Sequence, residues 1–257
     1  MPAVFVNGNP ESAAIWELLL AELDRSDVLR LSPPGFGAAV PDGFDCTVQA
    51  YQDWLATELE ALGEPVDIVG HDVGGSTVVS VAMARPDLLR TWASDSLGVF
   101  DPDYAWHDLA RIWQTPGAGE KSVAELIGGT LDERIERMAE RGIGRPIAAQ
   151  LAAAQGPDMG RAILAFYRSA AQPTMAELGR NLPAAAQRPG LAIIGTEDHF
   201  VGSEEMRRRS AARAGARAEV FDGLGHWWMV QDPARSARAI ASFWAETGPQ
   251  KPCIQAV

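Results

Sequence analysis

The 257-residue chain contains only two cysteines, Cys46 and Cys253, which stand far apart in the sequence. They offer neither a disulfide framework nor the close spacing of a zinc site, so we expect no metal and no bound cofactor. Basic residues are also few: 22 Lys and Arg stand against 34 Asp and Glu, which gives a net charge of −12. Binding to a phosphate backbone needs clustered positive charge, so nucleic acid is not an expected partner.

Long apolar runs are missing as well. No stretch approaches the roughly 18 consecutive apolar residues that span a bilayer, and we expect no membrane partner. The apolar start, 1–6, lacks the basic segment of a signal peptide and is typical of a first strand, which makes the cytoplasm the expected location. Hydrophobic residues make up 47% of the chain and charged residues 22%, as in globular proteins with a sizeable core. We expect a loosely ordered tail after Gly248.

Short β-branched runs alternate with helical periods along much of the chain, which predicts an α/β fold with a mostly parallel sheet flanked by helices. The expected strands are 3–6, 27–31, 66–69, 90–94, 191–194 and 218–221, and the expected helices are 12–23, 47–62, 76–84, 203–214 and 233–244. Between about 99 and 188, Gly and Pro interrupt helical stretches and no strand is expected. The predicted domains are therefore a core of 1–98 and 189–257 and an inserted helical cap of 99–188.

The most informative motif is Gly70-His71-Asp72-Val73-Gly74. It joins an expected strand to an expected helix and matches the strand–turn–helix elbow that exposes a nucleophile between two glycines. Asp72 stands at the nucleophile's position. A carboxylate that attacks an ester would give an unstable anhydride, whereas attack on an sp3 carbon gives an ester that water can cleave. The motif therefore favours hydrolysis of epoxides or carbon–halogen bonds, the alternative being a glycine-rich turn with a helix-capping Asp.

Hydrolysis of an enzyme ester also needs a base for water and an acid that orients the base. His226 follows the last expected strand, and Asp198 follows the strand before it. This order of nucleophile, acid and histidine is that of the α/β-hydrolase triad, and we predict Asp72, Asp198 and His226 as its members. Glu197 is the nearest competitor of Asp198, and a solvated loop carboxylate is the alternative for either. The side chain of His71 is expected to point away from Asp72.

With these motifs the chain resembles the α/β-hydrolase superfamily, and within it the aspartate-nucleophile branch of epoxide hydrolases and haloalkane and haloacetate dehalogenases. The matching segments are Asn7-Gly8-Asn9-Pro10, Gly35-Phe36-Gly37, Gly70 to Gly74, Asp198 and Gly225-His226-Trp227. The resemblance implies an α/β-hydrolase fold with a cap, and an oxyanion hole made by the backbone N–H groups of Asn9 and Val73. The family generally has His at position 7, so Asn7 leaves the hydrogen bonding of its loop open.

The leaving group separates the two chemistries. Asn9 resembles the halide-binding residue of haloalkane dehalogenases, but those enzymes have Trp directly after the nucleophile. Fluoroacetate dehalogenases usually have Arg at that position, and this chain has Val73. The segment Phe166-Tyr167-Arg168 resembles the cap segment that carries an epoxide-binding tyrosine, although fluoroacetate dehalogenases share Tyr-Arg. Gly225-His226-Trp227 also resembles the epoxide-hydrolase form.

A second donor beside Tyr167 is not obvious from the sequence. Tyr104 is a weak candidate, and the nearby Trp106 and His107 could supply an indole N–H or an imidazolium, or line the pocket. For Trp113 we favour a place in the helix core. The predicted substrate-binding residues are Tyr167, Trp106, His107 and Trp227.

The sequence thus predicts an epoxide hydrolase, with a haloalkane or haloacid dehalogenase as the alternative. A binding or biosynthetic accessory protein on the same fold is the second alternative, because a fold does not by itself fix an activity. The expected partner is a small, neutral, hydrophobic molecule, and a homodimer is one candidate assembly.

Overall fold

The computed structural model describes residues 1–248, and the tail after Gly248, including Cys253, lies outside them. Six parallel strands form one sheet in the order β2-β1-β3-β4-β5-β6. The strands are β1 (Ala3–Val6), β2 (Val28–Leu31), β3 (Val66–Gly70), β4 (Leu89–Ser94), β5 (Gly190–Gly195) and β6 (Arg217–Phe221). All six expected strands are present, each within one residue of its expected bounds.

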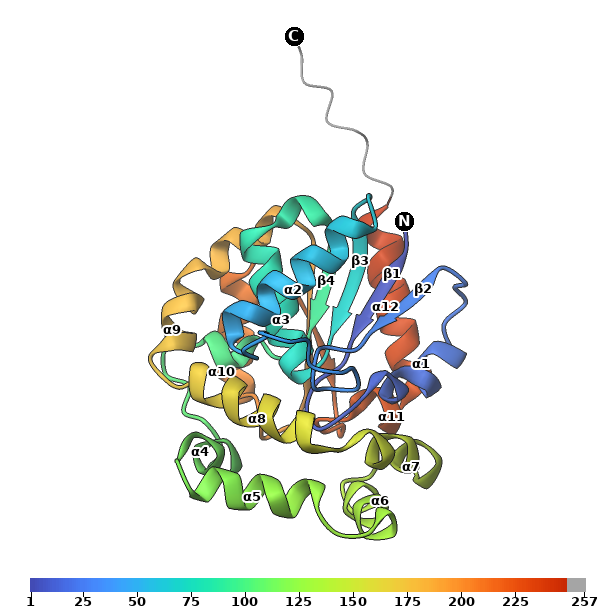
Figure 1. The fold of residues 1–257 in the computed structure, drawn as a ribbon. Helices are drawn as coiled ribbons and strands as arrows, with labels where there is room; N and C mark the ends of the chain where they lie inside the picture. The colour runs from blue at the N-terminus through green and yellow to red at the C-terminus, as the bar shows by residue number, and fades with distance from the viewer. Residues whose placement is uncertain (249–257) are drawn as a thin grey trace.

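Helices cover both faces of the sheet, as Figure 1 shows. One face carries α2 (Val48–Ala61), α3 (Asp72–Ala84) and α10 (Glu204–Arg213), and the other carries η1 (Ala13–Trp16), α1 (Glu17–Ala21), α11 (Trp228–Gln231) and α12 (Pro233–Thr247). A short η2 (Pro86–Leu88) leads into β4. Successive side chains of β1 point to opposite faces, so Val4 and Val6 join one apolar core and Ala3 and Phe5 the other. Burial on both faces explains why β1 is apolar throughout, whereas the edge strands β2 and β6 are partly exposed and carry Arg30 and Glu219.

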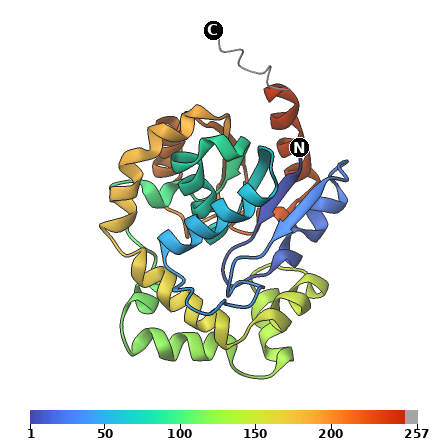
Figure 2. The same ribbon diagram turned by 45° about the horizontal axis from the view of Figure 1, so that its top comes forward.

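A helical segment connects β4 to β5 and contains no strand. It comprises η3 (Leu97–Phe100), α4 (Asp108–Gln114), α5 (Ala118–Ile127), α6 (Leu131–Ala139), α7 (Arg145–Ala154), α8 (Pro157–Ser169), α9 (Thr174–Leu178) and η4 (Gly179–Gln187). Figures 1 and 2 show α4 to α8 as a layer beyond the carboxyl ends of the strands. In contrast, η4 packs against α3 of the core. The division into core and cap at 99–188 stays a prediction.

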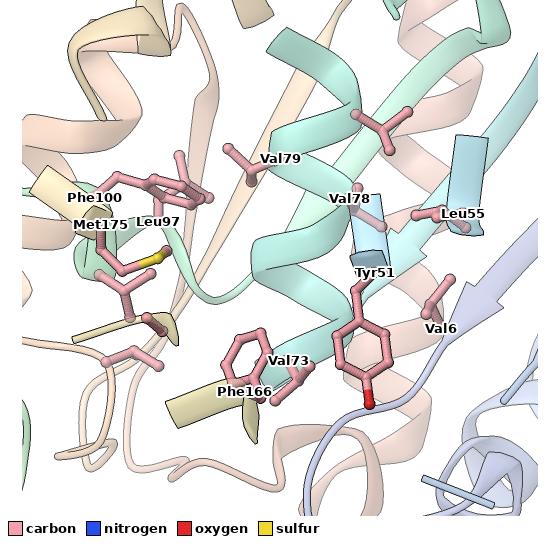
Figure 3. Close-up of a cluster of buried hydrophobic side chains, with 14 of the residues drawn as sticks. Val6, Tyr51, Leu55, Val73, Val78, Val79, Leu97, Phe100, Phe166 and Met175 are labelled. Atoms are coloured by element: carbon pink, nitrogen blue, oxygen red, sulfur yellow. The ribbon is translucent and has the colours of Figure 1, made fainter. Parts of the chain in front are cut away.

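Helix α8 rests directly on the core. Phe166 of α8 contacts Tyr51 of α2 with ring centroids 5.8 Å apart, and Val73 of α3 lies beside both rings in Figure 3. The neighbouring Leu55 and Val78 continue the same apolar cluster between α2 and α3. Burial of these large side chains stabilises the position of α8 above the elbow.

Three expected helices differ by more than one residue from their expected bounds, and one of them, α12, ends three residues later than expected, at Thr247. Helix α3 begins at Asp72, four residues before the expected start, because the elbow turns directly into its first helical turn. The expected helix 12–23 consists of η1 followed by α1, and the side chain of Ser12 accepts a hydrogen bond from the amide of Ala14. No helix within residues 1–248 is long and apolar enough to span a membrane.

Candidate active site

The elbow places Asp72 above the end of β3 in a backbone conformation that side chains rarely adopt. Its φ is +51°, in the left-handed region, where strained residues tend to occur at functional sites. Neighbouring glycines allow this packing: a Cβ on Gly8 would lie 2.5 Å from the Cβ of Asp72, and one on Gly74 would lie 2.5 Å from the carbonyl oxygen of Val6. The loop after β1 and the first turn of α3 therefore close tightly around Asp72.

One oxygen of the Asp72 carboxylate is already held by the expected oxyanion-hole residue. The backbone N–H of Asn9 donates to Oδ2 at 2.8 Å, whereas Oδ1 accepts no hydrogen bond from residues 1–248. Burial raises the pKa of Asp72, and the nearby His226 and His71 oppose that shift. The two oxygens thus differ: Oδ2 is fixed by the backbone and Oδ1 is available to a substrate.

Val73 and Asn7 complete the surroundings of this oxyanion position. Val73 is the second residue of α3, where backbone N–H groups have no acceptor within the helix, so its amide suits the predicted role of a second donor. The side-chain amide of Asn7 donates to the carbonyl of Phe36 at 3.0 Å and more distantly to that of Gly8. Asn7 therefore joins the loop after β1 to the 35–37 loop, which answers the question that the sequence left open.

Asp198 and His226 lie together at the ends of β5 and β6. His226 Nδ1 is 2.9 Å from Asp198 Oδ2, and the backbone N–H of Phe200 donates to Asp198 Oδ1 at 2.8 Å. Burial alone would lower the pKa of His226 and raise that of Asp198, but their mutual attraction and hydrogen bond reverse both shifts. Glu197 is exposed. The structure thus pairs His226 with Asp198, and their catalytic roles stay predictions.

A cavity of about 50 Å³ brings together the carboxylate and the imidazole. Its lining comprises Asn9, Pro10, Asp72, His107, Leu109, Trp113, Leu126, Arg141, Tyr167, Phe200, His226 and Trp227. Three of the four predicted substrate-binding residues are among these. Trp106, the fourth, lines a smaller cavity on another side of Asp72.

Tyr167 is buried, and its hydroxyl oxygen accepts a long hydrogen bond of 3.5 Å from Asn9 Nδ2. Burial raises the pKa of Tyr167 well above its ordinary value, and the Asn9 hydrogen bond lowers it in part. The phenol therefore keeps its proton at neutral pH. No acceptor within residues 1–248 takes that proton, so it is available to a bound molecule.

The other cap donors are mostly engaged within the protein. Tyr104 donates to the carbonyl of Phe200 at 2.7 Å, and Trp106 Nε1 donates to that of Ala170 at 3.0 Å. His107 Nδ1 accepts from the amide of Ala110, and burial lowers the pKa of His107 to about 4. The imidazolium considered from the sequence is therefore not the form of His107 at neutral pH.

Trp113 lies in the cavity wall as well as in the helix core favoured by the sequence. The ring is 3% exposed and its centroid is 4.8 Å from that of Tyr167. Its indole Nε1 is buried and has no hydrogen-bond partner in residues 1–248. Trp113 therefore lines the cavity and carries an N–H donor without a partner, which helical periodicity alone does not predict.

A buried charged cluster surrounds His71, the residue before Asp72, and no sequence motif predicted it. His71 Nδ1 lies 2.5 Å from Asp95 Oδ2 and Nε2 lies 3.1 Å from Glu11 Oε1. Trp227 donates to the same Glu11 oxygen at 2.6 Å and Trp228 to the same Asp95 oxygen at 2.7 Å. We call Glu11, His71, Asp95, Trp227 and Trp228 the core-side cluster.

The core-side cluster also holds the elbow. Asp95 Oδ1 accepts the backbone N–H of Asp72 at 3.0 Å. Burial alone would lower the pKa of His71, but Glu11 and Asp95 raise it well above its ordinary value, so the ring is an imidazolium. The ring centroid of His71 also lies 4.5 Å from that of His226. A signal was present in the sequence, since Asp95 directly follows β4, and parallel strands end at one edge of a sheet.

Within residues 1–248, no three His, Cys, Asp or Glu side chains are arranged to hold a metal ion. Cys46 is a free, buried cysteine and is not among the residues that line the cavity.

The six-stranded sheet, the elbow and the Asp198–His226 pair are the features of a hydrolase with the α/β-hydrolase fold. The chain belongs to the alpha/beta hydrolase family, whose family model matches residues 3–239. An uncharacterized protein of Mycobacterium tuberculosis is 26% identical over 269 residues, which cover 96% of this chain and 76% of that protein.

Solved structures with the same fold have different activities. A haloalkane dehalogenase from Bradyrhizobium elkani matches with a TM-score of 0.70 at 20% identity, covering 95% of this chain and 91% of that one. An enol-lactonase from Burkholderia xenovorans matches with a TM-score of 0.72 at 18% identity and the same coverage. At these identities the likeness establishes the fold, and the reaction has to be argued from the site.

Proposed function

We propose that this protein opens epoxides to diols through a covalent ester on Asp72. Oδ1 attacks an epoxide carbon, the carbon–oxygen bond breaks, and the electron pair goes to the former ring oxygen. Oδ2 becomes the carbonyl oxygen of the new ester. Because the Asn9 N–H already donates to Oδ2 at 2.8 Å, this donor is in place for the oxyanion that forms when water attacks the ester.

The observation that carries the choice of an epoxide is the hydroxyl of Tyr167. Its oxygen accepts from Asn9 Nδ2, and its proton has no acceptor in the described part of the chain. A proton donor at this position stabilises the alkoxide as the ring opens. The Asn9 amide supports the phenol oxygen as its proton moves towards the substrate, since the same contact lowers the pKa of Tyr167.

The second half of the reaction uses His226. Its Nδ1 is engaged with Asp198, which leaves Nε2 to take a proton from water. The resulting hydroxide attacks the ester carbonyl, the oxyanion collapses, and the alkoxide released from the ester takes the proton that the hydroxide brought to the carboxyl group. The proton on His226 passes to the Tyr167 phenolate through solvent, so the diol leaves with Asp72, His226 and Tyr167 restored. Asp198 stabilises the imidazolium that forms, as its contribution to the raised pKa of His226 indicates.

The test measures the diol product and the incorporation of oxygen-18 into Asp72. Incubation with small alkyl and aryl epoxides in oxygen-18 water should give diols, and repeated turnovers should place oxygen-18 in the Asp72 carboxylate, read from the mass of its peptide. This is expected because water attacks the enzyme ester and not the substrate carbon. Diol formation with no label on Asp72 would contradict the covalent route, and absence of any diol would remove the epoxide assignment.

Dehalogenation is a second candidate because of Trp113. A halide leaving group needs two or more N–H donors in a dry pocket, and the sequence supplies no indole directly after the nucleophile. Trp113 and Asn9 both line the cavity, Trp113 Nε1 has no partner within residues 1–248, and these two N–H donors could hold a halide between them. Both reactions use Asp72 in the same way, so only the leaving-group donors distinguish them.

The two candidates respond differently to Trp113→Phe and Tyr167→Phe. For a dehalogenase, removal of the indole N–H should lower halide release from bromoalkanes at least tenfold, on the scale of a lost donor to developing charge. For an epoxide hydrolase, loss of the Tyr167 hydroxyl should be the larger effect. Robust halide release by the unaltered protein, with no diol from any epoxide, would favour the dehalogenase activity over the epoxide hydrolase activity.

A further inference from the structure

Arg141 lies in the turn between α6 and α7 and lines the same cavity as Asp72 and His226. The turn is firmly held: the backbone N–H of Arg141 donates to the carbonyl of Met138 at 3.1 Å. Met138 and Ile143, on either side of it, are each 1% exposed and belong to the apolar core under α1, α11 and α12. Arg141 is therefore presented from a fixed turn and not from a loose loop.

Among the described residues, the guanidinium of Arg141 has no carboxylate in contact with it, although the charges of Glu11 and Glu140 act on it from a distance and raise its pKa in part. Within residues 1–248 it forms no ion pair; it lies 6.0 Å from the centre of the Trp227 ring and has a weak contact of 3.9 Å with Met138 Sδ. Arg145, four residues later, is exposed and pairs with Glu136. A half-buried cation that faces a cavity without a carboxylate partner is unusual, because such groups are normally paired.

The chemistry of a guanidinium indicates which ligand group would pair with Arg141. A guanidinium presents a planar set of donors that matches a carboxylate in two parallel hydrogen bonds, and it stays charged even where burial lowers its pKa. Apolar and aromatic side chains such as Leu126 and Trp227 make up much of the nearby wall, where such a pair is strengthened by the low dielectric.

We propose that the substrate carries a carboxylate that Arg141 binds, which replaces the neutral substrate expected from the sequence. Tyr167 and Trp113 come from α8 and α4, whereas Arg141 comes from the α6–α7 turn at the opposite end of the helical layer (Figure 1). The carboxylate and the leaving oxygen then lie at different ends of the substrate, with the reacting carbon at Asp72. The position of that carbon rests on the function proposed above.

The experiment compares an acid with its matched amide. The substrates are 3,4-epoxybutanoate and 3,4-epoxybutanamide, and the variants are Arg141→Gln, Arg141→Lys and the matched control Arg145→Gln. Arg141→Gln should lower kcat/KM for the acid by roughly tenfold to a hundredfold, the range for a hydrogen bond between charged groups, and change the amide less than about twofold. Arg141→Lys should restore part of the loss, and Arg145→Gln should match the parent protein.

Binding of butanoate, which has no epoxide to open, tests the anion site independently of the proposed reaction. Calorimetric titration of the unaltered protein should detect butanoate and not butanamide, and Arg141→Gln should abolish the butanoate signal. If butanoate binds through Arg141 but no epoxide is opened, the anion site stands and the proposed function fails. If both epoxides are opened with equal loss in Arg141→Gln, the arginine only balances buried Glu11, and the anion site is overturned. Absence of butanoate binding would overturn it as well.

Discussion

The polar groups on the two sides of Asp72 differ in whether they have hydrogen-bond partners within the protein. In the core-side cluster, both ring nitrogens of His71, both indole nitrogens and three of the four carboxylate oxygens have partners, Glu11 Oε2 being the exception. We call Trp113, Arg141 and Tyr167 the cap-side donors. They carry an indole N–H, a guanidinium and a phenol proton that have no acceptor of comparable strength within residues 1–248.

The difference indicates two roles: the core-side cluster supports the backbone of the elbow, and the cap-side donors are expected to bind the substrate. Buried polar groups are normally satisfied, and the core-side cluster obeys that rule because it fixes the backbone that carries the nucleophile. Donors left without partners around a cavity cost stability unless a ligand completes them. The cap-side donors are therefore the part of the site that a substrate is expected to satisfy, and substitutions on the two sides should have different consequences.

The largest expected effect on turnover is that of Asp72→Asn, which changes the proposed nucleophile itself, between the core-side cluster and the cap-side donors. A neutral amide is a poor nucleophile, so turnover of any epoxide should fall by roughly 10⁴-fold or more. Asn tolerates a positive φ, so the elbow should keep its backbone conformation. Steady-state diol formation measures the loss, with the unfolding midpoint in urea as the control. Turnover within tenfold of the parent would contradict the nucleophile assignment.

On the core side, His71→Gln should damage the fold. It removes the cation between Glu11 and Asp95 and leaves two buried carboxylates without their counter-charge, which costs about 3–5 kcal/mol. Urea unfolding measures this as a lower free energy of unfolding. Trp228→Phe is the milder comparison, because it removes one hydrogen bond to Asp95. A loss below about 1 kcal/mol in His71→Gln would mean that the cluster does not support the elbow.

On the cap side, Tyr167→Phe should leave stability almost unchanged and slow formation of the alkyl ester by roughly tenfold to a thousandfold. Hydrolysis of the ester should change much less, since the leaving alkoxide is no longer involved. Rapid-mixing measurements of the two steps test this. Tyr104→Phe is the matched control, because its hydroxyl donates to the Phe200 carbonyl and lines a different hollow. An unchanged alkylation rate would make Tyr167 a structural residue.

The smallest expected effect is a shift in pH dependence. His226 must be neutral to accept a proton, and its raised pKa places the acidic limb of ester hydrolysis above pH 6.5: the rate falls as the pH drops through the pKa of the folded protein. Asp198→Asn removes a main cause of the raised pKa, so the limb should move to lower pH and the rate above it should fall. A limb at or below pH 6.5 in the parent, or one that moves upward in the variant, would contradict the pairing.

The sequence predicted the sheet and the elbow because both depend on local patterns. Short runs of four or five residues rich in β-branched and apolar side chains predicted the strands, and the two glycines that flank the elbow, Gly70 and Gly74, predicted the turn. The partnership of His226 with Asp198 was also predictable, because chain order fixes which strand ends meet. Roles in catalysis stay predictions that the variants above test.

The core-side cluster and the cap-side donors could not be predicted in the same way. Glu11 and Asp95 meet His71 across 60 and 24 residues, and no local pattern links them. Whether Trp113 faces the core or the cavity depends on the angle at which α4 rests on α8, which periodicity does not define. Arg141 is one of many arginines in the chain, and only the structure distinguishes it by its missing partner.

The most direct test of the covalent mechanism is the mass of the intact His226→Gln variant after exposure to an epoxide. Attack by Asp72 does not need the imidazole, but cleavage of the ester does. The variant should therefore gain one substrate mass, located on the peptide that contains Asp72, while the parent protein shows none at steady state. Turnover by His226→Gln at the parental rate, or an adduct on any residue other than Asp72, would contradict the account.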